Sequence, residues 1–243
     1  MCRHLGYVGP AVPVAEPVTR GAHSLRTQSW APRDMRGGGT INADGFGVAW
    51  WPQAGSDARR YRNPMPIWSD PAVDEVLSEI RSTAVVAAVR SATVGMPVER
   101  SACAPFTSGR WAFSHNGVVP DWRQSIAAAA PDVGDVALLD LESPTDSAGL
   151  WLLLQACLQV DVPELALVEV IKRVAVAGAR LNLLLGDGES IWATTYYHSL
   201  SVLVDDDSVC VSSEPYDDNP AWQSIPDRRL VIARPGHVSI EPL

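Results

Sequence analysis

Lysine is nearly absent from this chain of 243 residues, because Lys172 is the only one. No run of basic residues exceeds two, and the formal net charge is −9. A protein that binds the phosphate backbone of a nucleic acid needs clustered positive charge. The sequence offers no such cluster, so we expect no nucleic-acid partner.

Long hydrophobic runs are also missing. A membrane-spanning helix needs about 20 consecutive apolar residues, and no run in this chain approaches that length. The first twenty residues contain charged side chains and lack the apolar segment of a signal peptide. We therefore expect no membrane association and a cytoplasmic location.

Cysteines are few and scattered, and no two are separated by only two residues. The four are Cys2, Cys103, Cys157 and Cys210. This pattern favours reduced thiols over a disulfide framework or a zinc site, and we expect no metal and no cofactor. The chain is 47% apolar and shows no repeat or low-complexity linker. It predicts a single domain over residues 2–243.

Short apolar runs with β-branched residues dominate both ends of the chain, and helical periodicity fills the middle. Strands are predicted at 2–8, 46–51, 83–89, 111–114, 180–185, 190–195, 199–204, 208–211, 230–233 and 237–240. Helices are predicted from Thr145 or Asp146 to about 160, from Pro163 to Gly178, and in a short segment from about Pro120. Strands on both sides of a helical pair indicate an α+β layered fold with two sheets.

The N-terminus places Cys2 directly after the initiator Met1. Aminopeptidases remove a methionine that precedes a small residue, so we expect Met1 to be removed. Cys2 would then carry a thiol and a free α-amine, whose ordinary pKa is about 8. One residue could supply the nucleophile and its base together. The alternative is a packed thiol without a chemical role.

A glycine-rich segment, "RGGGTINADGFGVAWW", covers residues 36–51. Its glycines indicate unusual backbone angles before a strand, and the alternative to a functional loop is a glycine-rich hairpin. Neither phosphate-binding glycine pattern is present, and a strand follows instead of a helix. Asn42, Asp44 and Gly45 are the candidate site residues in this segment.

The segment "VVAAVRSATVG", residues 85–95, is a buried strand that ends in Arg90, with Thr93 three residues later. A buried guanidinium needs a partner because an unpaired charge is costly to bury. The partner could be a carboxylate of the protein. It could equally be a substrate carboxylate, which arginine binds with two parallel hydrogen bonds.

The segment "RWAFSHNGVV", residues 110–119, is a strand that ends in His115, Asn116 and Gly117. The Asn116 amide and the Gly117 N–H could point at one spot and form an oxyanion hole. The alternative is a simple turn, since Asn-Gly is a common turn pair. For His115 a hydrogen-bonded structural role is favoured over that of a base.

The segment "SPTDSAGLW", residues 143–151, places Asp146 at the start of a helix. Its carboxylate could cap the helix. It could also face an ammonium group of a substrate.

Taken together, "MCRHLGY", "NADGFGVAW", "VRSATVG", "APFTSGRWAFSHNG" and "TDSAGLW" resemble, in this order, the class II glutamine amidotransferases, which are N-terminal-nucleophile hydrolases. The resemblance implies a four-layer αββα sandwich. It implies that Cys2 is the nucleophile and, through its amine, the base. Asn116 and Gly117 match the oxyanion hole, and residues 42–45 match the loop beside the site. Arg90 and Thr93 match the contacts to the α-carboxylate of a glutamyl group, and Asp146 matches the contact to its α-ammonium.

Two positions depart from the family pattern. Many relatives have histidine where this chain has Ala104, before Pro-Phe, and histidine where it has Val94. These changes concern the acceptor side of the pocket and leave the glutamyl contacts intact.

Within the family, "AVRSATVGMPV", "SPTDSAGLWLLL" and "SSEPYDD" resemble the amidohydrolases of ergothioneine biosynthesis. That resemblance implies removal of glutamate from γ-glutamyl-hercynylcysteine sulfoxide, a small-molecule substrate, and allows a homo-oligomer. A trimethylammonium group could contact an aromatic ring, and each candidate ring could instead belong to the core. The candidates are Trp30, Trp50, Trp68, Tyr196 and Tyr197. The alternatives are a glutaminase subunit that supplies ammonia to a partner, and a non-catalytic γ-glutamyl-binding scaffold.

Overall fold

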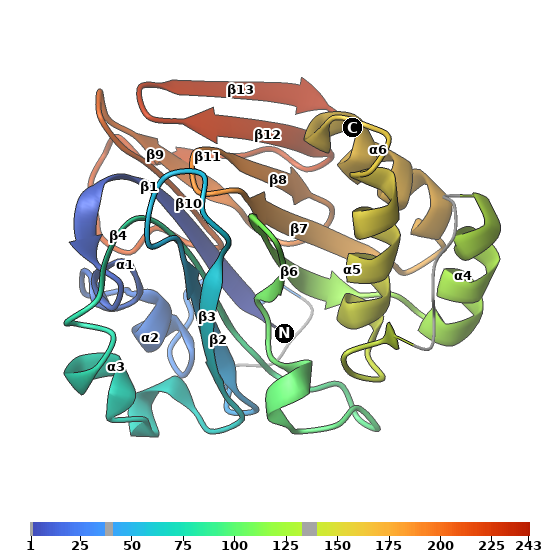
Figure 1. Cartoon of the computed structure of the whole chain (residues 1–243), viewed down its shortest axis with the longest axis horizontal. Helices are drawn as coiled ribbons and strands as arrows, with labels where there is room; N and C mark the ends of the chain where they lie inside the picture. Colours follow the sequence, from blue (N-terminus) through green and yellow to red (C-terminus); the bar gives the residue numbers. More distant parts are fainter. Residues whose placement is uncertain (1, 37–40, 133–139) are drawn as a thin grey trace.

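Two antiparallel β-sheets lie face to face, and helices cover the outer face of each (Figure 1). The computed structural model describes residues 2–36, 41–132 and 140–243. Within these ranges no helix is long and apolar enough to cross a bilayer. Met1, residues 37–40 of the glycine-rich segment and residues 133–139 lie outside the described residues.

The first sheet has seven strands, with β1 (Arg3–Pro13) and β4 (Arg81–Val89) near its middle. Arg3 pairs with Val89, so the start of β1 lies beside the end of β4. The order is β11 (Gln223–Ser224), β9 (Ser201–Val204), β10 (Val209–Ser212), β1, β4, β2 (Phe46–Trp50) and β3 (Arg59–Asn63). This register brings the segment before β1 next to the segment after β4.

The second sheet has six strands and lies over the first. Its order is β13 (His237–Pro242), β12 (Arg229–Arg234), β8 (Ile191–Thr195), β7 (Arg180–Gly186), β6 (Trp111–Val118) and β5 (Phe106–Ser108). All its pairs are antiparallel.

The helices form two groups on opposite outer faces (Figure 1). The first group is α1 (Glu16–Thr19), α2 (Leu25–Gln28) and α3 (Ala72–Glu75). The second is α4 (Trp122–Ala129), α5 (Asp146–Cys157) and α6 (Pro163–Val174). Short 3₁₀ turns cover Ile67–Ser69, Arg100–Ala102 and Ala130–Asp132. Thr145 caps α5, and Pro163 starts α6, where its missing N–H costs nothing.

Three apolar clusters separate these layers. One lies between the second sheet and α4–α6, and includes Phe113, Trp151 and Leu167. Another lies between the first sheet and α1–α3. The third joins the two sheets, and includes Val86 and Leu184. Because alternate strand residues face opposite sides, each sheet buries both faces, and the predicted four-layer αββα sandwich is confirmed.

Several sequence-based boundaries are wrong. Strand β6 runs from Trp111 to Val118, so the predicted bound at 114 is four residues short and the alternative Asn-Gly turn is incorrect, whereas the strand does end close to His115, Asn116 and Gly117. Helix α6 ends at Val174, one turn before Gly178. Strand β3, "RRYRN", is a polar edge strand without apolar alternation, so no hydrophobic pattern predicted it. Helices α1 to α3 have four residues each, too few to show a helical period.

Candidate active site

Cys2 lies directly before β1 and lines a small cavity where β1 starts and β4 ends. Its thiol is half-buried, while the other three cysteines are buried. Burial raises the pKa of the Cys103 and Cys157 thiols to about 11 each, which keeps them protonated. Cys2 is thus the accessible thiol of the four. The other residues that line the cavity are Ala88, Val89, Arg90, Ala102, Ala104, His115 and Ser147.

Arg90 follows β4 directly and reaches the same cavity as Cys2. Its Nη1 donates to the carbonyl of Pro97 at 2.8 Å and more weakly to that of Asp44 at 3.5 Å. Its side chain is almost fully buried, yet no acid among the described residues forms an ion pair with it. The alternative of a structural ion pair is therefore not what the structure has. The other N–H groups of the Arg90 guanidinium stay available for a carboxylate.

The loop of Asn42, Asp44 and Gly45 shapes the turn after Arg90. The Asp44 carboxylate accepts from the Ala92 N–H at 2.7 Å, and its backbone N–H donates to the Arg90 carbonyl at 3.0 Å. Gly45 has φ +116°, and a Cβ there would lie 2.4 Å from Cys103 Sγ. Only glycine fits that position. Asn42 is buried, and its Oδ1 has no partner among the described residues.

Thr93 and Val94 lie on the exposed loop after Arg90 and do not line the cavity. Val94 instead borders an open groove with Gly95, Met96 and the start of α4. The structure therefore places Arg90 beside Cys2 and leaves Thr93 outside.

His115, Asn116 and Gly117 are consecutive in β6 and face alternate sides. His115 Nε2 donates to the Arg180 carbonyl at 2.9 Å, so Nδ1 is the acceptor for the Ser147 hydroxyl at 3.0 Å when the ring is neutral. A Cβ at Gly117 would lie 1.8 Å from the same Arg180 carbonyl oxygen. Asn116 is buried on the face toward the other sheet, and its Oδ1 has no partner among the described residues. The structural role predicted for His115 fits these contacts.

Asp146 is the first residue of α5, and Thr145, rather than Asp146, is its cap. One Asp146 oxygen accepts from the Val119 N–H at 3.0 Å, and the other from the Ser147 N–H at 2.8 Å. The carboxylate thus joins the end of β6 to α5. It does not line the cavity, whereas its neighbour Ser147 does. We did not anticipate Ser147 from the sequence, and its position after Asp146 was the only available signal.

The candidate aromatic side chains lie away from this cavity. Trp30 and Trp68 are each 42% exposed and form an edge-to-face pair at 5.5 Å, so the core alternative is wrong for both. Trp50 packs against the first sheet's outer cluster. Tyr196 and Tyr197 already carry the guanidinium groups of Arg228 and Arg180 at 3.6 and 4.3 Å from their ring centres. A trimethylammonium at either ring would compete with an arginine.

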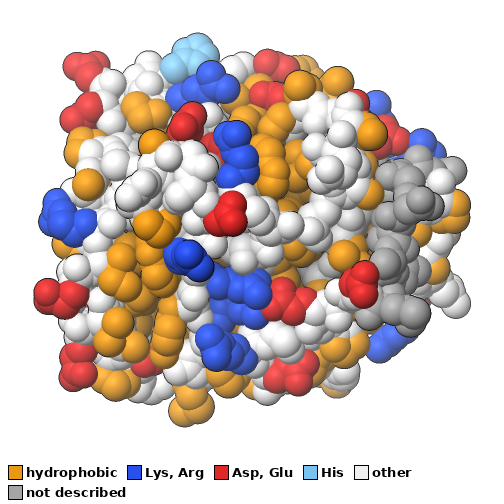
Figure 2. Space-filling view, in the orientation of Figure 1, with side chains coloured by type: hydrophobic (Ala, Val, Ile, Leu, Met, Phe, Trp, Pro, Cys, Tyr) orange, Lys and Arg blue, Asp and Glu red, His pale blue; other side chains and the backbone are white. Residues whose placement is uncertain are grey.

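Charged side chains on the face drawn in Figure 2 lie intermixed, blue beside red, between apolar areas.

All four cysteines are free thiols. Among the described residues, no three His, Cys, Asp or Glu side chains lie together as metal ligands would.

Two buried histidines lie near the site. Burial, and to a smaller extent repulsion from His115 and His198 if these rings were protonated, lowers the pKa of His4 to about 3. Burial and the nearby Arg180 lower that of His198 to about 3. Both rings are therefore neutral at pH 7, and neither ring nitrogen of His4 has a partner among the described residues.

Because these two histidines stay neutral in the folded protein, we expect its free energy of unfolding to fall in mild acid. The unfolded chain binds protons as the pH falls below about 6.5, while the folded chain does not until about 3. The free energy of unfolding should fall by up to about 1.4 kcal/mol per pH unit for each histidine in that window. Urea unfolding at pH 7.5 and pH 5 measures the slope. His4→Leu should make it shallower and the exposed His237→Gln should not; equal slopes in all three proteins would contradict the assignment.

Comparison with known proteins shows the family of this chain. The family model described as glutamine amidotransferases class-II matches residues 21–206. A protein of Mycolicibacterium smegmatis named gamma-glutamyl-hercynylcysteine sulfoxide hydrolase is 40% identical over 246 residues, which cover 100% of both chains. A protein of the same name from Mycobacterium tuberculosis is 42% identical over 231 residues, which cover 95% of this chain and 92% of the relative.

Solved structures have the same fold. A glutamine aminotransferase class-II domain protein from Silicibacter pomeroyi superposes with a TM-score of 0.69 at 24% identity, covering 99% of this chain and 98% of that one. Glutamine phosphoribosylpyrophosphate amidotransferase from B. subtilis gives a TM-score of 0.67 at 13% identity, covering 99% of this chain and 49% of that one. With its cysteine-lined cavity, its four layers, the matching family model and relatives covered over 92% and 100% of their length, the chain belongs to the class II glutamine amidotransferases.

Proposed function

We propose that this protein hydrolyses a γ-glutamyl amide and releases glutamate, with γ-glutamyl-hercynylcysteine sulfoxide as its substrate. The observation that carries the proposal is the half-buried Cys2 thiol beside Arg90 in one cavity. The name of the full-length relatives supplies the substrate. The reaction would belong to ergothioneine biosynthesis.

The proposed reaction has two steps. In the first, the Cys2 amine takes the thiol proton, and the sulfur attacks the γ-carbonyl carbon. The Asn116 amide and the Gly117 N–H stabilise the negative oxygen of the tetrahedral intermediate. The intermediate collapses, the C–N bond breaks, and the amine leaves with the proton. In the second step water, deprotonated by the same amine, attacks the thioester and releases glutamate and the free thiol.

The α-end of the glutamyl group is assigned to Arg90, Thr93 and Asp146. Arg90 supports this because it lines the cavity without an acidic partner among the described residues. Asp146 supports it because a carboxylate has about four acceptor positions, and backbone N–H groups use only some of them. Thr93 would have to approach from its exposed loop. The loop of Asn42, Asp44 and Gly45 would hold the Arg90 turn in place.

Product analysis tests the proposal. Purified protein is incubated with γ-glutamyl-hercynylcysteine sulfoxide, other γ-glutamyl conjugates, their α-glutamyl isomers and glutamine, and glutamate is measured. We expect the sulfoxide conjugate to react fastest and the α-isomers not at all. Glutamine as the best substrate would favour a glutaminase subunit. Binding without turnover would favour a scaffold.

Four expectations from the sequence stay predictions: the removal of Met1, the single domain, the cytoplasmic location and a homo-oligomer.

Arg90→Lys should lower kcat/KM by about 30-fold or more, because a desolvated charge pair contributes roughly 2 to 5 kcal/mol and a single ammonium lacks the guanidinium fork. Steady-state kinetics on the γ-glutamyl conjugate measure the loss. Arg62→Lys is the control for loss of a buried guanidinium: Arg62 is equally buried and also donates to carbonyls, those of Ser101 and Cys103, but it pairs with Glu142 and lies outside the cavity. An Arg90→Lys enzyme as active as the control would contradict the assigned carboxylate contact.

A further inference from the structure

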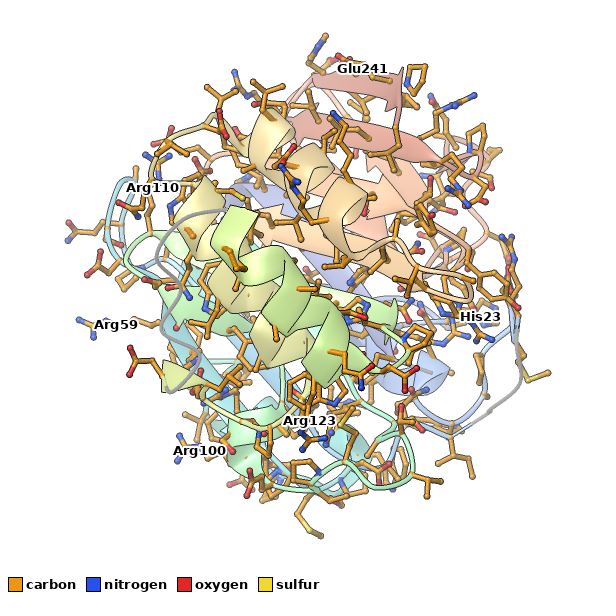
Figure 3. All side chains as sticks on the ribbon, turned by 90° about the vertical axis from the view of Figure 1, so that its right-hand side faces the viewer. His23, Arg59, Arg100, Arg110, Arg123 and Glu241 are labelled. Carbon is orange, nitrogen blue, oxygen red and sulfur yellow. The ribbon has the colours of Figure 1, made fainter. Side chains whose placement is uncertain are left out.

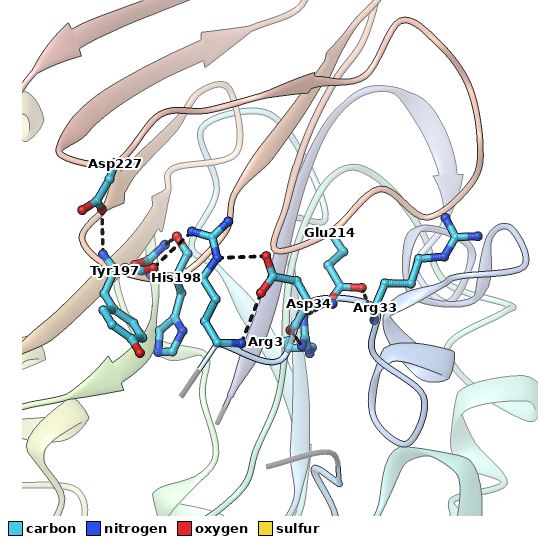
Figure 4. A network of polar contacts seen from close by, with 9 residues as sticks. Arg3, Arg33, Asp34, Tyr197, His198, Glu214 and Asp227 are labelled. Atoms are coloured by element: carbon cyan, nitrogen blue, oxygen red, sulfur yellow. Dashed lines mark hydrogen bonds and ion pairs between the residues drawn. The ribbon is translucent and has the colours of Figure 1, made fainter. Parts of the chain in front are cut away.

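Glu214 is a buried acid that no step above uses. It lies two residues after β10, and its two carboxylate oxygens bind three donors (Figure 4). Oε2 accepts from the Arg33 N–H at 2.9 Å, and Oε1 from the Asp34 N–H at 2.9 Å. Oε1 also forms an ion pair with the Arg3 guanidinium. The acid therefore connects a surface loop to the first residue of β1.

Arg3 connects the same loop from the other side. It is the residue after Cys2, and its side chain is only 2% exposed. One terminal nitrogen binds Glu214, and the other donates to the Asp34 carbonyl oxygen. The backbone beside it is fixed as well, because the His4 carbonyl accepts from the Ser213 N–H at 3.0 Å and the His4 N–H donates to Ser213 Oγ at 3.0 Å.

The loop continues this network toward the second sheet. Asp34 forms an ion pair with Arg36 at 3.0 Å, and Arg36 donates to the Tyr197 carbonyl at 3.3 Å. Segments around residues 3, 34, 197 and 214 therefore meet beside the N-terminus, although they are far apart in the sequence (Figure 4).

Stability alone does not explain a buried pair of this kind. Two apolar side chains of similar volume often hold a fold as well as or better than a buried ion pair, because the charges must be desolvated. What the pair provides is directed geometry: a guanidinium and a carboxylate with five donors and several acceptors fix both orientation and distance. Reaction rates are sensitive to geometry, since a misplacement of about 1 Å can lower a rate about 100-fold.

We propose that Arg3 and Glu214 are positioning residues, which hold Cys2 and the 33–36 loop in the arrangement that turnover requires. The inference rests on the proposed hydrolysis at Cys2. Arg3 holds the residue next to the nucleophile, and Glu214 fixes Arg3 and the loop at once. Neither side chain lines the cavity, so both act through their neighbours.

The test compares Glu214→Gln with Asp187→Asn. Asp187 resembles Glu214 in its own contacts: it is buried, pairs with an arginine, and accepts from the Glu189 and Ser190 N–H groups at 2.9 and 2.8 Å, although its partner Arg110 is half-exposed. Asp187 lies far from the Glu214 network. Arg180, whose guanidinium lies over the Tyr197 ring, starts β7, and Asp187 follows the other end of that strand, about 23 Å away at about 3.3 Å per residue. In Figure 3, Arg110 and His23, a neighbour of Arg33, lie on opposite sides of the molecule.

Kinetics on the γ-glutamyl conjugate are measured well below the melting temperature of each variant. Glu214→Gln should lower kcat about 10- to 100-fold with KM changed by less than about twofold, since binding contacts stay in place. Asp187→Asn should also lower the melting temperature but leave kcat within about twofold. Arg3→Lys, which keeps the charge but cannot bridge Glu214 and Asp34, should lie between them. It serves as the second variant if Glu214→Gln does not fold.

Two results would overturn the inference in distinguishable ways. If the wild type hydrolyses γ-glutamyl amides but Glu214→Gln and Arg3→Lys match Asp187→Asn in kcat, the pair is structural only, and the proposed function stands. If the wild type hydrolyses no γ-glutamyl amide, the proposed function fails and the inference fails with it.

Discussion

Cys2→Ala is expected to abolish turnover, with a loss of about 10⁴-fold or more in kcat, because it removes the thiol that attacks the γ-carbonyl carbon and leaves the α-amine with no nucleophile to activate. The fold should persist. Cys2 precedes β1, is half-buried, and its sulfur makes only a weak contact with the Ser91 carbonyl at 3.8 Å. Glutamate release from the γ-glutamyl conjugate, together with a melting curve, measures both parts. Cys2→Ser should retain only a small fraction of the activity, because a hydroxyl is a much weaker nucleophile than a thiol beside the same amine.

Cys157→Ala is the control for loss of a thiol as such. Cys157 is buried in α5 within the helix-side cluster, and burial raises its pKa to about 11. Its removal should lower stability through the space it leaves and spare kcat. Full activity in Cys2→Ala, or equal losses in both variants, would refute a mechanism through Cys2.

Asn116→Ala should lower kcat by about 10² to 10³-fold with little change in KM, because an oxyanion donor acts on charge that develops only in the transition state. Asn116 is not among the residues that line the Cys2 cavity, so this prediction rests on the family match of the Asn-Gly pair. Asn116 lies in β6, almost fully buried, so its amide is held without competition from bulk water. Steady-state kinetics on the conjugate separate kcat from KM.

Ser114→Ala is the matched control, since Ser114 lies two residues earlier on the same face of β6, and its Oγ is also buried without a partner among the described residues. It should change kcat by less than about twofold. A loss confined to KM in Asn116→Ala would assign the amide to binding of the ground state. Equal losses at both positions would indicate a general effect of polarity between the sheets.

The order of short motifs was enough to predict the family, the four layers and the presence of Cys2 and Arg90 at the site. Apolar β-branched runs have a period that is readable locally, so most strands were found within a few residues of their true bounds. The alternative of a turn at the Asn-Gly pair is wrong, because a turn preference is also local. In the molecule, β7 lies opposite β6 and pairs with Asn116 and Gly117, which a reading of neighbouring residues could not show.

The sequence by itself determined which side chains are available: a thiol at position 2, an arginine after an apolar strand, and an aspartate at the start of a helix. Only the tertiary structure decided which of them meet. Arg90 reaches the Cys2 cavity and Thr93 does not; Ser147 lines it while Asp146 binds backbone. Glu214 meets Arg3 across 211 residues of sequence. Such contacts depend on strand register and on the burial of charges, and these are properties of the packed sheets that no local stretch of sequence contains.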